Sequence, residues 1–328
     1  MSNLLEIENL SVHFPVAASG FRGKARTLRA VDDVSMHIAP GETLGVVGES
    51  GCGKTTLGRA ILRLLKPTEG TIRFDGLDIS RAGPAEMARV RRSLQAIFQD
   101  PYGSLNPRLR VRDIVAEPLT NLGWERHLVE ARVAEVLEIV GLPPEYSTRY
   151  PHAFSGGQRQ RIGIARALAP SPQLIVCDEA VSALDVSIQA QILNLLKDVQ
   201  AKYGVAYLFV SHNLAVVRHL SHRVAVMYLG RIVELCDEAS LFANPLHPYT
   251  VALIAAVPEP DPTRPLGPPA LEGDLPSPMA PPSGCSFRSR CPIAVERCQH
   301  EPPPLAEHAP GRLVRCHFPG SYRAPIPT

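Results

Sequence analysis

The chain has 328 residues, of which 45% are hydrophobic, and a formal net charge of +2. This near-neutral balance excludes a long basic face for nucleic acid and an acidic tail. No apolar run approaches the ~18 residues that cross a bilayer, and the start, MSNLLEIENL, lacks the basic segment of a secretion signal. We therefore expect a water-soluble cytoplasmic protein whose seven cysteines are reduced thiols unless they bind a metal.

The first 240 residues alternate strand-like and helix-like segments, which predicts an α/β fold with a sheet covered by helices. Three short apolar runs end in glycine or polar residues, as buried strands do where ligands bind beyond their carboxyl ends. These runs span 43–50, 174–179 and 206–212. Helical spacing predicts a helix over 57–65, and TIRFDGLDI at 71–79 predicts a hairpin that turns at Asp75-Gly76.

The character of the chain changes twice after this. Between about 100 and 154 it is helical, with RVAEVLEIVGL at 132–142 ending at a glycine stop signal, which predicts an inserted helical subdomain. Of the 32 prolines, 18 lie in the last 71 residues, together with four of the seven cysteines. We expect a main domain at 1–240 and a small Cys/Pro-rich extension at 241–328.

Residues 48–55, GESGCGKT, match the phosphate-loop pattern G-x-x-x-x-G-K-[ST] between a predicted strand and a predicted helix. The pattern predicts backbone N–H groups turned toward phosphates, with Lys54 neutralising terminal charge and the Thr55 hydroxyl binding Mg²⁺. An ordinary glycine turn before a helix is the alternative. The nucleotide-binding residues expected here are Gly48, Ser50, Gly51, Gly53, Lys54, Thr55 and Thr56.

Polar side chains also follow the two later strands. Asp178 is expected to hold Mg²⁺ and Glu179 to act as the general base for hydrolysis. His212 is expected to donate to the terminal phosphate. The alternatives are a helix-capping acidic pair and a purely structural histidine.

A second anion cradle is predicted in AFSGGQRQRIGIARAL at 153–168. Ser155 and Gln158 satisfy the capping box, so a helix should begin here, and Gly156 and Gly157 leave its first amides bare. Because the phosphate loop already surrounds one nucleotide, this second cradle is expected to close over the nucleotide of a neighbouring subunit.

The chain resembles the ATPase subunits of ABC transporters over about 4–240, since FSGGQRQRIGIARAL is similar to the ABC signature. The resemblance implies a RecA-like P-loop NTPase core with an antiparallel β subdomain and a helical ABC subdomain at about 100–154. It implies that Gln99 of IFQDP senses the γ-phosphate and contributes to Mg²⁺ binding, and that Asp185 of SALD signals across a dimer. It makes His212 the switch histidine and Phe14 the aromatic that stacks on adenine.

Three further stretches, at 100–108, 178–196 and 244–258, resemble the oligopeptide, dipeptide and nickel importers. This implies peptide import driven by ATP at the cytoplasmic face of the inner membrane. The implied partners are a paralogous ATPase or a second copy, two permease subunits and an extracytoplasmic substrate-binding protein. The alternative, a soluble ABC ATPase acting on ribosomes or DNA, usually has two cassettes, a coiled coil or a basic arm, so we expect no nucleic-acid partner.

The last four cysteines, Cys285, Cys291, Cys298 and Cys316, suggest a metal site. They lack the C-x₂₋₄-C pairs of zinc sites, and Cys291-Pro292 is similar to the Cys-Pro pair of ferredoxin motifs. Similar tails in this importer group are associated with a 4Fe-4S cluster, which is the expectation here, in a structural role. Zinc, free thiols and a disulfide are the alternatives.

Overall fold

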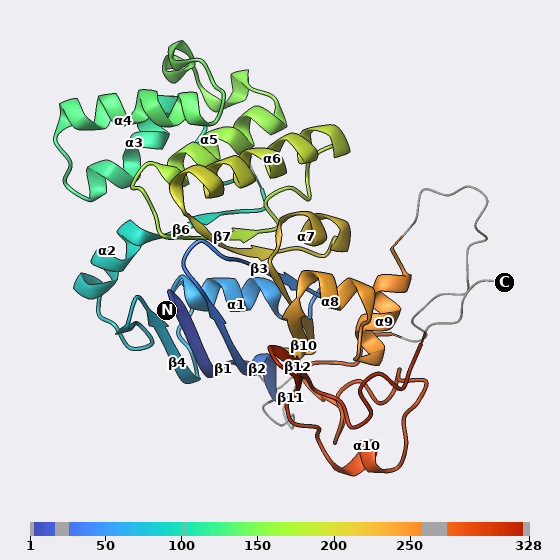
Figure 1. Ribbon diagram of the computed structural model, residues 1–328. Coiled ribbons are helices and arrows are strands. Elements are labelled where there is room, and N and C mark those ends of the chain that lie inside the picture. Colours follow the sequence, from blue (N-terminus) through green and yellow to red (C-terminus); the bar gives the residue numbers. More distant parts are fainter. Residues whose placement is uncertain (1–2, 17–25, 101–102, 258–273, 324–328) are drawn as a thin grey trace, which may run out of the picture.

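The computed structural model describes residues 3–16, 26–100, 103–257 and 274–323 (Figure 1). Residues 101–102 of the stretch DPYGSLNPR lie outside the described part. So do the last residue of the 244–258 stretch and the proline-rich segment that follows it, as far as residue 273.

Two β-sheets form the frame of the described chain. The larger has eight strands in the order β11-β12-β10-β9-β3-β8-β7-β6, and the smaller has four in the order β2-β1-β4-β5. Strands β9, β3, β8, β7 and β6 pair in parallel, whereas β10, β12 and β11 continue the sheet with antiparallel pairs. The larger sheet contains β3 (Thr43–Val47), β6 (Leu94–Ile97), β7 (Leu174–Asp178), β8 (Ala206–Val210), β9 (Arg223–Tyr228), β10 (Arg231–Asp237), β11 (Ala306–Ala309) and β12 (Arg312–Val314). The smaller contains β1 (Leu5–Val16), β2 (Arg26–Ile38), β4 (Glu69–Phe74) and β5 (Leu77–Asp78).

The predicted hairpin is confirmed as β4 and β5. Phe74 pairs with Leu77, and Asp75 and Gly76 between them have φ values of 48° and 77°. Positive φ at both central residues is the conformation that suits a two-residue hairpin turn, which explains why Asp-Gly occupies it.

The two faces of the central strands bury different cores, because successive side chains of a strand point to opposite faces. On β8, Tyr207 and Phe209 join a core with α5 (Gly156–Leu168), α6 (Val186–Tyr203) and α7 (Leu214–Leu220). Leu208 and Val210 join a second core with α1 (Lys54–Ile61) and the smaller sheet. Helix α1 therefore lies between the two sheets, in contact with β1 and β2 and with β7 and β8.

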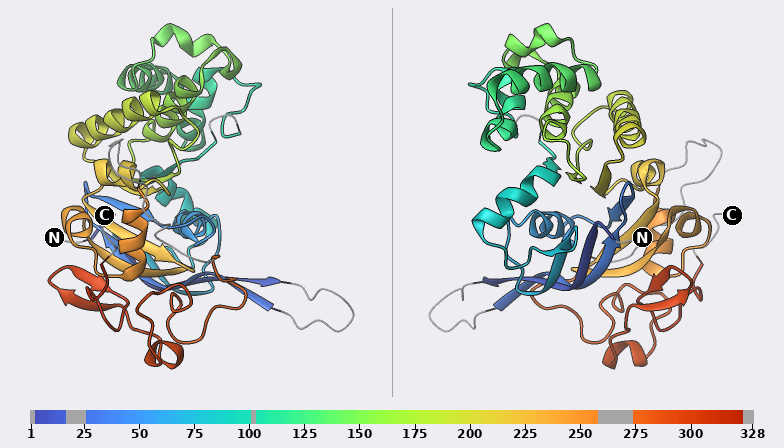
Figure 2. Two further views of the ribbon diagram at one scale, coloured as in Figure 1. Left: turned by 90° about the vertical axis from the view of Figure 1, so that its right-hand side faces the viewer. Right: turned by 60° about the vertical axis from the view of Figure 1, so that its left-hand side comes forward.

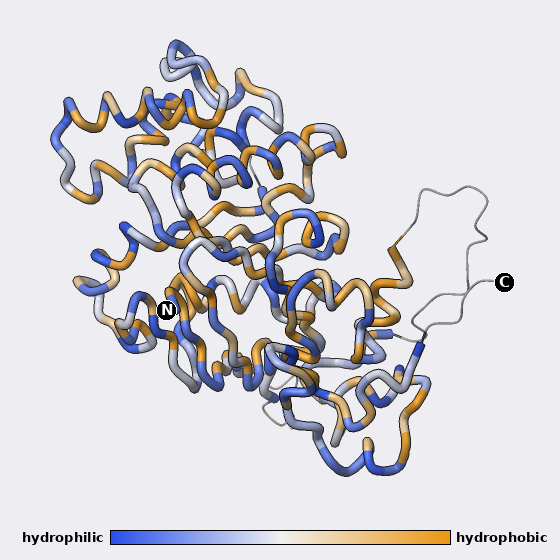
Figure 3. Tube along the Cα trace, in the orientation of Figure 1, coloured by the Kyte–Doolittle hydropathy of each residue, from blue (hydrophilic) through white to orange (hydrophobic). Residues whose placement is uncertain are grey.

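The helices α3 (Val111–Asn121), α4 (Arg126–Ile139) and α5 pack together at one end of the molecule. Figure 3 shows hydrophobic and hydrophilic residues alternating along α4, the pattern of a helix with one buried face. Both views in Figure 2 place these helices opposite the C-terminal extension. The stop signal predicted at 132–142 is confirmed, because α4 ends just before Gly141, whose φ is 70°.

Of the remaining helices, α1 ends earlier than its apolar spacing predicted, and the others were not predicted from the sequence. The helix predicted over 57–65 is α1, which begins three residues earlier, directly after the phosphate loop, and ends at Ile61. Arg63 adopts a positive φ of 55°, which ends the helical path. The others are α2 (Pro84–Ser93), α8 (Glu238–Ala243), α9 (Pro248–Ala255), α10 (Arg297–His300) and the short 3₁₀ turns Pro144–Thr148 and Pro151–Ala153.

The C-terminal extension is joined to the core by backbone pairing. Strand β12 pairs with β10, matching Glu234 with Val314 and Leu235 with Leu313. The segment after the described gap therefore completes the larger sheet, and the α/β architecture runs through both parts of the chain.

Candidate functional site

The phosphate loop connects β3 to α1, and its glycines are required by close approach of neighbouring backbone. A Cβ added to Gly53 would lie 2.0 Å from the Ala30 carbonyl oxygen, and one added to Gly48 would lie 2.2 Å from that of Met227. Their φ values of 108° and 155° also favour glycine. Ser50 and Gly51 are exposed at the tip of the loop, which leaves room for a ligand there.

Lys54 lies across the loop rather than in solvent. Its side chain is buried, and Nζ donates to the Gly48 carbonyl at 2.7 Å and to the Glu49 carbonyl at 2.9 Å. Thr56 follows in the first turn of α1, whose free N–H groups point toward the loop. The loop, the ammonium group and the helix N-terminus therefore form one positively polarised site for phosphate.

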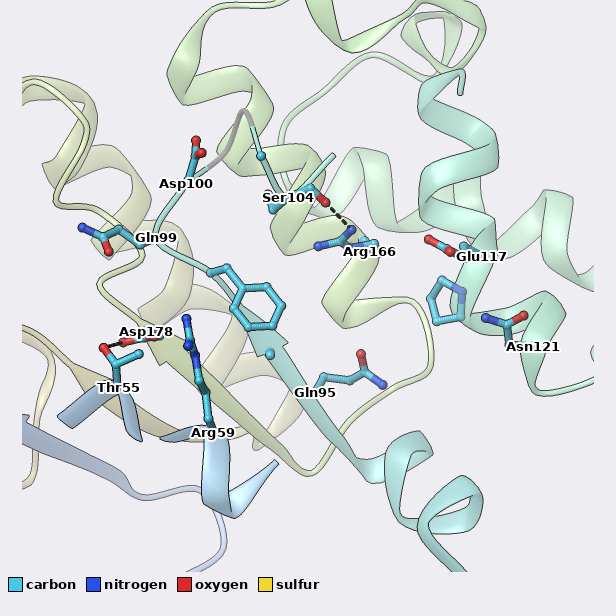
Figure 4. Close-up of a pocket in the computed structure, with 14 residues that line it drawn as sticks. Thr55, Arg59, Gln95, Gln99, Asp100, Ser104, Glu117, Asn121, Arg166 and Asp178 are labelled. Carbon is cyan, nitrogen blue, oxygen red and sulfur yellow. Dashed lines mark hydrogen bonds between the residues drawn. The ribbon is translucent and has the colours of Figure 1, made fainter. Parts of the chain in front are cut away.

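Thr55 and Asp178 meet because parallel strands β3 and β7 bring their carboxyl ends to the same edge of the sheet. Thr55 Oγ1 donates to Asp178 Oδ1 at 3.0 Å, and Figure 4 shows the two side chains facing each other. Burial raises the pKa of Asp178, while the Thr55 hydrogen bond acts to lower it. With Gln99, these residues line a cleft of about 690 Å³. Hydroxyl, carboxylate and amide oxygens are a ligand set that suits Mg²⁺.

Glu179 and His212 form the second polar pair of the site. His212 Nδ1 lies 3.0 Å from Glu179 Oε1, and the Glu179 backbone N–H donates to the Val210 carbonyl at 2.9 Å. Glu179 has a φ of 49°, which is unusual for a residue with a side chain. The structure thus brings together the predicted base and the predicted histidine.

The helix predicted at Ser155 is confirmed as α5, with its capping box. Ser155 Oγ accepts the Gln158 N–H at 3.3 Å, and Gln158 Oε1 accepts the Ser155 N–H at 3.0 Å. A Cβ on Gly157 would lie 2.5 Å from Ile188 Cγ2, so the start of α5 packs directly against the start of α6. Asp185 caps α6 there, and its hydrogen bonds to Ile188 N–H and Ser187 Oγ lower its pKa.

The start of α5 does not line the cleft beside Thr55 and Asp178. Within the described ranges, neither Ser155, Gly156, Gly157 and Gln158 nor Asp185 lines the cleft that holds Thr55 and Asp178. Phe14 is also placed apart from that cleft, half-buried on β1 opposite Leu28. The strand pair that carries it reaches the phosphate loop through Ala30 of β2.

Two residues from the C-terminal side, Arg290 and Tyr249, contact the phosphate loop without having been predicted. Glu49 forms an ion pair with Arg290, and its backbone N–H donates to Tyr249 Oη at 2.9 Å. Buried Glu234, which accepts N–H groups of Leu246 and His247 at the start of α9, was not predicted either. Tyr249 lies in a stretch that the family resemblance singled out, whereas no pattern marks Arg290.

The four C-terminal cysteines surround one small pocket. Cys285, Cys291, Cys298 and Cys316 line it together with apolar side chains that include Phe287, and about 10 Å³ is free inside. Burial raises the pKa of Cys291 and of Cys316 to about 11 each. All four are free thiols, so the disulfide alternative is absent from the described chain.

The pocket fits the proposed cluster in donor type and number but not in its present geometry. Among the residues that the structure describes, no group of three or more His, Cys, Asp or Glu side chains is arranged to hold a metal ion. The free space is about that of one water molecule, so a cubic cluster would require the walls to move apart. The four thiols thus converge as an iron–sulfur centre would require, but the described residues do not form a metal-binding site.

No helix among the described residues is long and apolar enough to cross a membrane.

Comparisons with known families and structures agree with the geometry. Residues 31–182 match the family model described as ABC transporter, and residues 233–298 match the oligopeptide/dipeptide transporter C-terminal region. The chain is 55% identical over 315 residues to a probable peptide ABC transporter ATP-binding protein of Sinorhizobium fredii, covering 96% of this chain and 89% of that one. It is 50% identical over 323 residues to an oligopeptide transport ATP-binding protein of Bacillus subtilis, covering 96% and 97%.

Two solved structures are similar in fold. One is cbiO1 from Clostridium perfringens, part of an ABC transporter complex, with a TM-score of 0.64, 26% identity and coverage of 74% of this chain and 92% of that one. The other is an ATP-binding cassette in a dimeric post-hydrolysis state bound to ADP and Pi, with a TM-score of 0.62, 27% identity and coverage of 71% and 98%. The chain therefore belongs to the ATPase subunits of the ABC transporter family, in the group that carries the oligopeptide/dipeptide transporter C-terminal region.

Proposed function

We propose that this chain is the ATP-hydrolysing subunit of an importer for dipeptides or oligopeptides. The observation that carries the proposal is the pairing of two separate phosphate cradles, one at Gly48–Thr55 and one at the start of α5, with a peptide-transporter C-terminal region. The names of the relatives support peptides as the cargo. The match to that region also favours transport over action on ribosomes or DNA.

The residues divide the chemistry of hydrolysis between them. The phosphate-loop amides and Lys54 bind the phosphates, while Thr55, Gln99 and Asp178 are the ligands proposed for Mg²⁺. Bound Mg²⁺ neutralises charge on the phosphate oxygens. A Glu179 carboxylate oxygen accepts a proton from the attacking water as the bond between the γ-phosphorus and the ADP oxygen breaks. His212 Nδ1 lies against Glu179, so Nε2 is the ring nitrogen proposed to face the terminal phosphate.

Hydrolysis is proposed to need two chains. The start of α5 would contact the γ-phosphate held by the other chain, through Ser155, Gly156, Gly157 and Gln158. Asp185 would carry the signal between the two nucleotide sites. Phe14 would stack on the adenine of the nucleotide bound to its own chain. Since ATP contacts both chains, it favours the closed dimer, and loss of the γ-phosphate removes part of that preference. Opening and closing would then move the permease subunits.

The proposed assembly follows from this group of transporters. The second ATPase is a paralogue or another copy of this chain, bound beneath two permease subunits at the cytoplasmic face of the inner membrane. An extracytoplasmic binding protein supplies the substrate. In this arrangement the antiparallel β subdomain is the smaller sheet, and the helical ABC subdomain at about 100–154 contains α3 and α4.

The test is Glu179→Gln in the assembled transporter. Removing the base should lower ATP hydrolysis at least 100-fold while ATP binding remains, so that the ATP-bound dimer accumulates. Phosphate release from the assembled transporter and gel filtration of the isolated chain with ATP measure the two effects, and Glu238→Gln on α8 is the matched control. Turnover close to that of the wild type would exclude Glu179 as the base.

We further propose that the four-cysteine pocket holds a 4Fe-4S cluster that orders the extension. The convergence of four thiols on one small pocket supports this proposal, and zinc is the alternative. Anaerobic purification should give brown protein with about four irons per chain. Cys298→Ser should lose that iron, while Cys236→Ser, outside the pocket, should keep it. Colourless protein that contains only zinc would contradict the cluster.

A further inference from the structure

The loop between Cys285 and Cys291 reaches back to the phosphate loop. The Arg290 guanidinium holds the Glu49 carboxylate through two hydrogen bonds, of 2.8 Å from Nη1 to Oε2 and 3.0 Å from Nη2 to Oε1. The Arg290 side chain is only 6% exposed, and that of Glu49 is 25% exposed. Paired geometry and low exposure distinguish this contact from the surface ion pairs that contribute little.

An aromatic cluster holds Arg290 in place. Phe287 packs edge-on against Tyr228 with ring centroids 5.2 Å apart, and against Tyr249 at 5.5 Å. The Arg290 guanidinium carbon lies 6.0 Å from the centre of the Tyr228 ring. Burial alone would lower the pKa of Arg290, but the hydrogen-bonded Glu49 carboxylate raises it above its ordinary value, so the guanidinium stays charged.

The extension therefore contacts both the side chain and the backbone of Glu49. Tyr249 Oη accepts the Glu49 N–H, while the Glu49 carbonyl accepts a hydrogen bond from Lys54 Nζ. Glu49 directly follows Gly48, the first glycine of the loop. A carboxylate at this position repels the phosphates of a nucleotide unless another group neutralises it.

We propose that Arg290 is a positioning residue for nucleotide binding: it neutralises Glu49 and fixes the phosphate loop, so that the triphosphate meets no uncompensated carboxylate. The proposal rests on the proposed role of Gly48–Thr55 as the nucleotide site. It assigns the cysteine-rich extension a direct effect on nucleotide affinity, through a contact 241 residues apart in sequence.

A charge-suppression experiment on the full chain tests this. We expect Arg290→Gln to weaken MgATP binding by about tenfold. Adding Glu49→Gln to it should restore the affinity to within about twofold of the wild type, because the repelling charge is then gone. Arg290→Lys, which keeps the charge but loses the paired geometry, should fall between wild type and Arg290→Gln. Titration with a fluorescent ATP analogue gives Kd, and melting temperatures report folding.

The matched control is Arg297→Gln in the same extension, whose exposed guanidinium donates to Glu301 instead of the phosphate loop. It should bind MgATP like the wild type. In the transporter, Arg290→Gln should raise KM more than it lowers kcat. A double variant as weak as Arg290→Gln, or an Arg290→Gln chain with unchanged Kd, would overturn the proposal. Failure of the wild-type chain to bind MgATP would instead overturn the proposed function.

Discussion

Lys54 shows how the site is prepared at the scale of single residues. Its ammonium group is buried and held by two carbonyl oxygens of its own loop, so it is already at the phosphate site before any nucleotide arrives. Less side-chain freedom is then lost on binding, which is the advantage of a preorganised site. On binding, Lys54 Nζ can exchange these carbonyl acceptors for phosphate oxygens.

Lys54→Ala should therefore weaken nucleotide binding itself and not only turnover. A charge-assisted hydrogen bond contributes about 1.5–3 kcal/mol, which corresponds to a loss of roughly 10- to 100-fold in affinity. The measurement is the Kd of the isolated chain for MgATP, with exposed Lys66→Ala as control. An unchanged Kd would remove Lys54 from the site.

At the same scale, a contact could be predicted from the sequence only where its residues lie close together along the chain. The phosphate loop was predictable because its glycines, Lys54 and Thr55 lie within eight residues and each has a local geometric reason. The contact of Glu49 with Arg290 was not predictable, because no local sequence pattern at either residue indicates the other. Only folding of the extension onto the core brings them together.

At the scale of elements, the N-terminus of α9 shows a histidine used as a neutral cap. His247 Nδ1 accepts the Tyr249 N–H at 3.0 Å, and the side chain is 1% exposed. Burial lowers the pKa of His247 to about 3, from an ordinary value of 6.5. The cap acts only while the ring is uncharged, so α9 is coupled to pH.

This coupling predicts a loss of stability in acid. Between pH 6.5 and 3 the unfolded chain binds a proton at this histidine that the folded chain does not, so the free energy of unfolding falls as the pH drops. From pH 7 to 5 this one residue contributes a loss of about 2 kcal/mol. His247→Asn keeps a capping oxygen and removes the titration, so its denaturant midpoint should fall less over that range. If the denaturant midpoints of the wild type and of His247→Asn fell equally between pH 7 and 5, His247 would not be the source of the acid sensitivity.

Elements with strong local signals were predictable, and their limits were less so. The hairpin at Asp75-Gly76 and the capping box at Ser155 were identified because two or three adjacent residues determine each. Helix α1 begins earlier than its apolar pattern because the phosphate loop, and not the hydrophobic spacing, sets its start. Strands β11 and β12 have no apolar alternation, and they form only because β10 offers a partner.

At the scale of the whole molecule, the two predicted cradles lie at the N-termini of different helices, α1 and α5, of the same chain. The phosphate loop is fixed between the two sheets, whereas the second cradle opens from α5 among the helices at the far end (Figure 1). If the proposed function is correct, a single chain has half of each catalytic site. Turnover should therefore depend on the concentration of the partner.

Substitution of Ser155 tests this division. Ser155→Asp keeps a capping side chain but places a negative charge where the γ-phosphate is expected, whereas Ser155→Asn keeps the cap without the charge. We expect both isolated chains to bind MgATP like the wild type. In the assembled transporter Ser155→Asp should hydrolyse ATP at least tenfold more slowly than Ser155→Asn. Weaker binding by the isolated Ser155→Asp chain would contradict a site shared between chains.

The pairing of β12 with β10 has a consequence for how this chain tolerates truncation. A protein cut after α9 would leave β10 with a row of free N–H and C=O groups at the margin of the large sheet, next to the buried carboxylate of Glu234. Unpaired edge strands tend to pair with strands of other molecules. We therefore expect a chain shortened in this way to self-associate and precipitate rather than to remain a minimal enzyme.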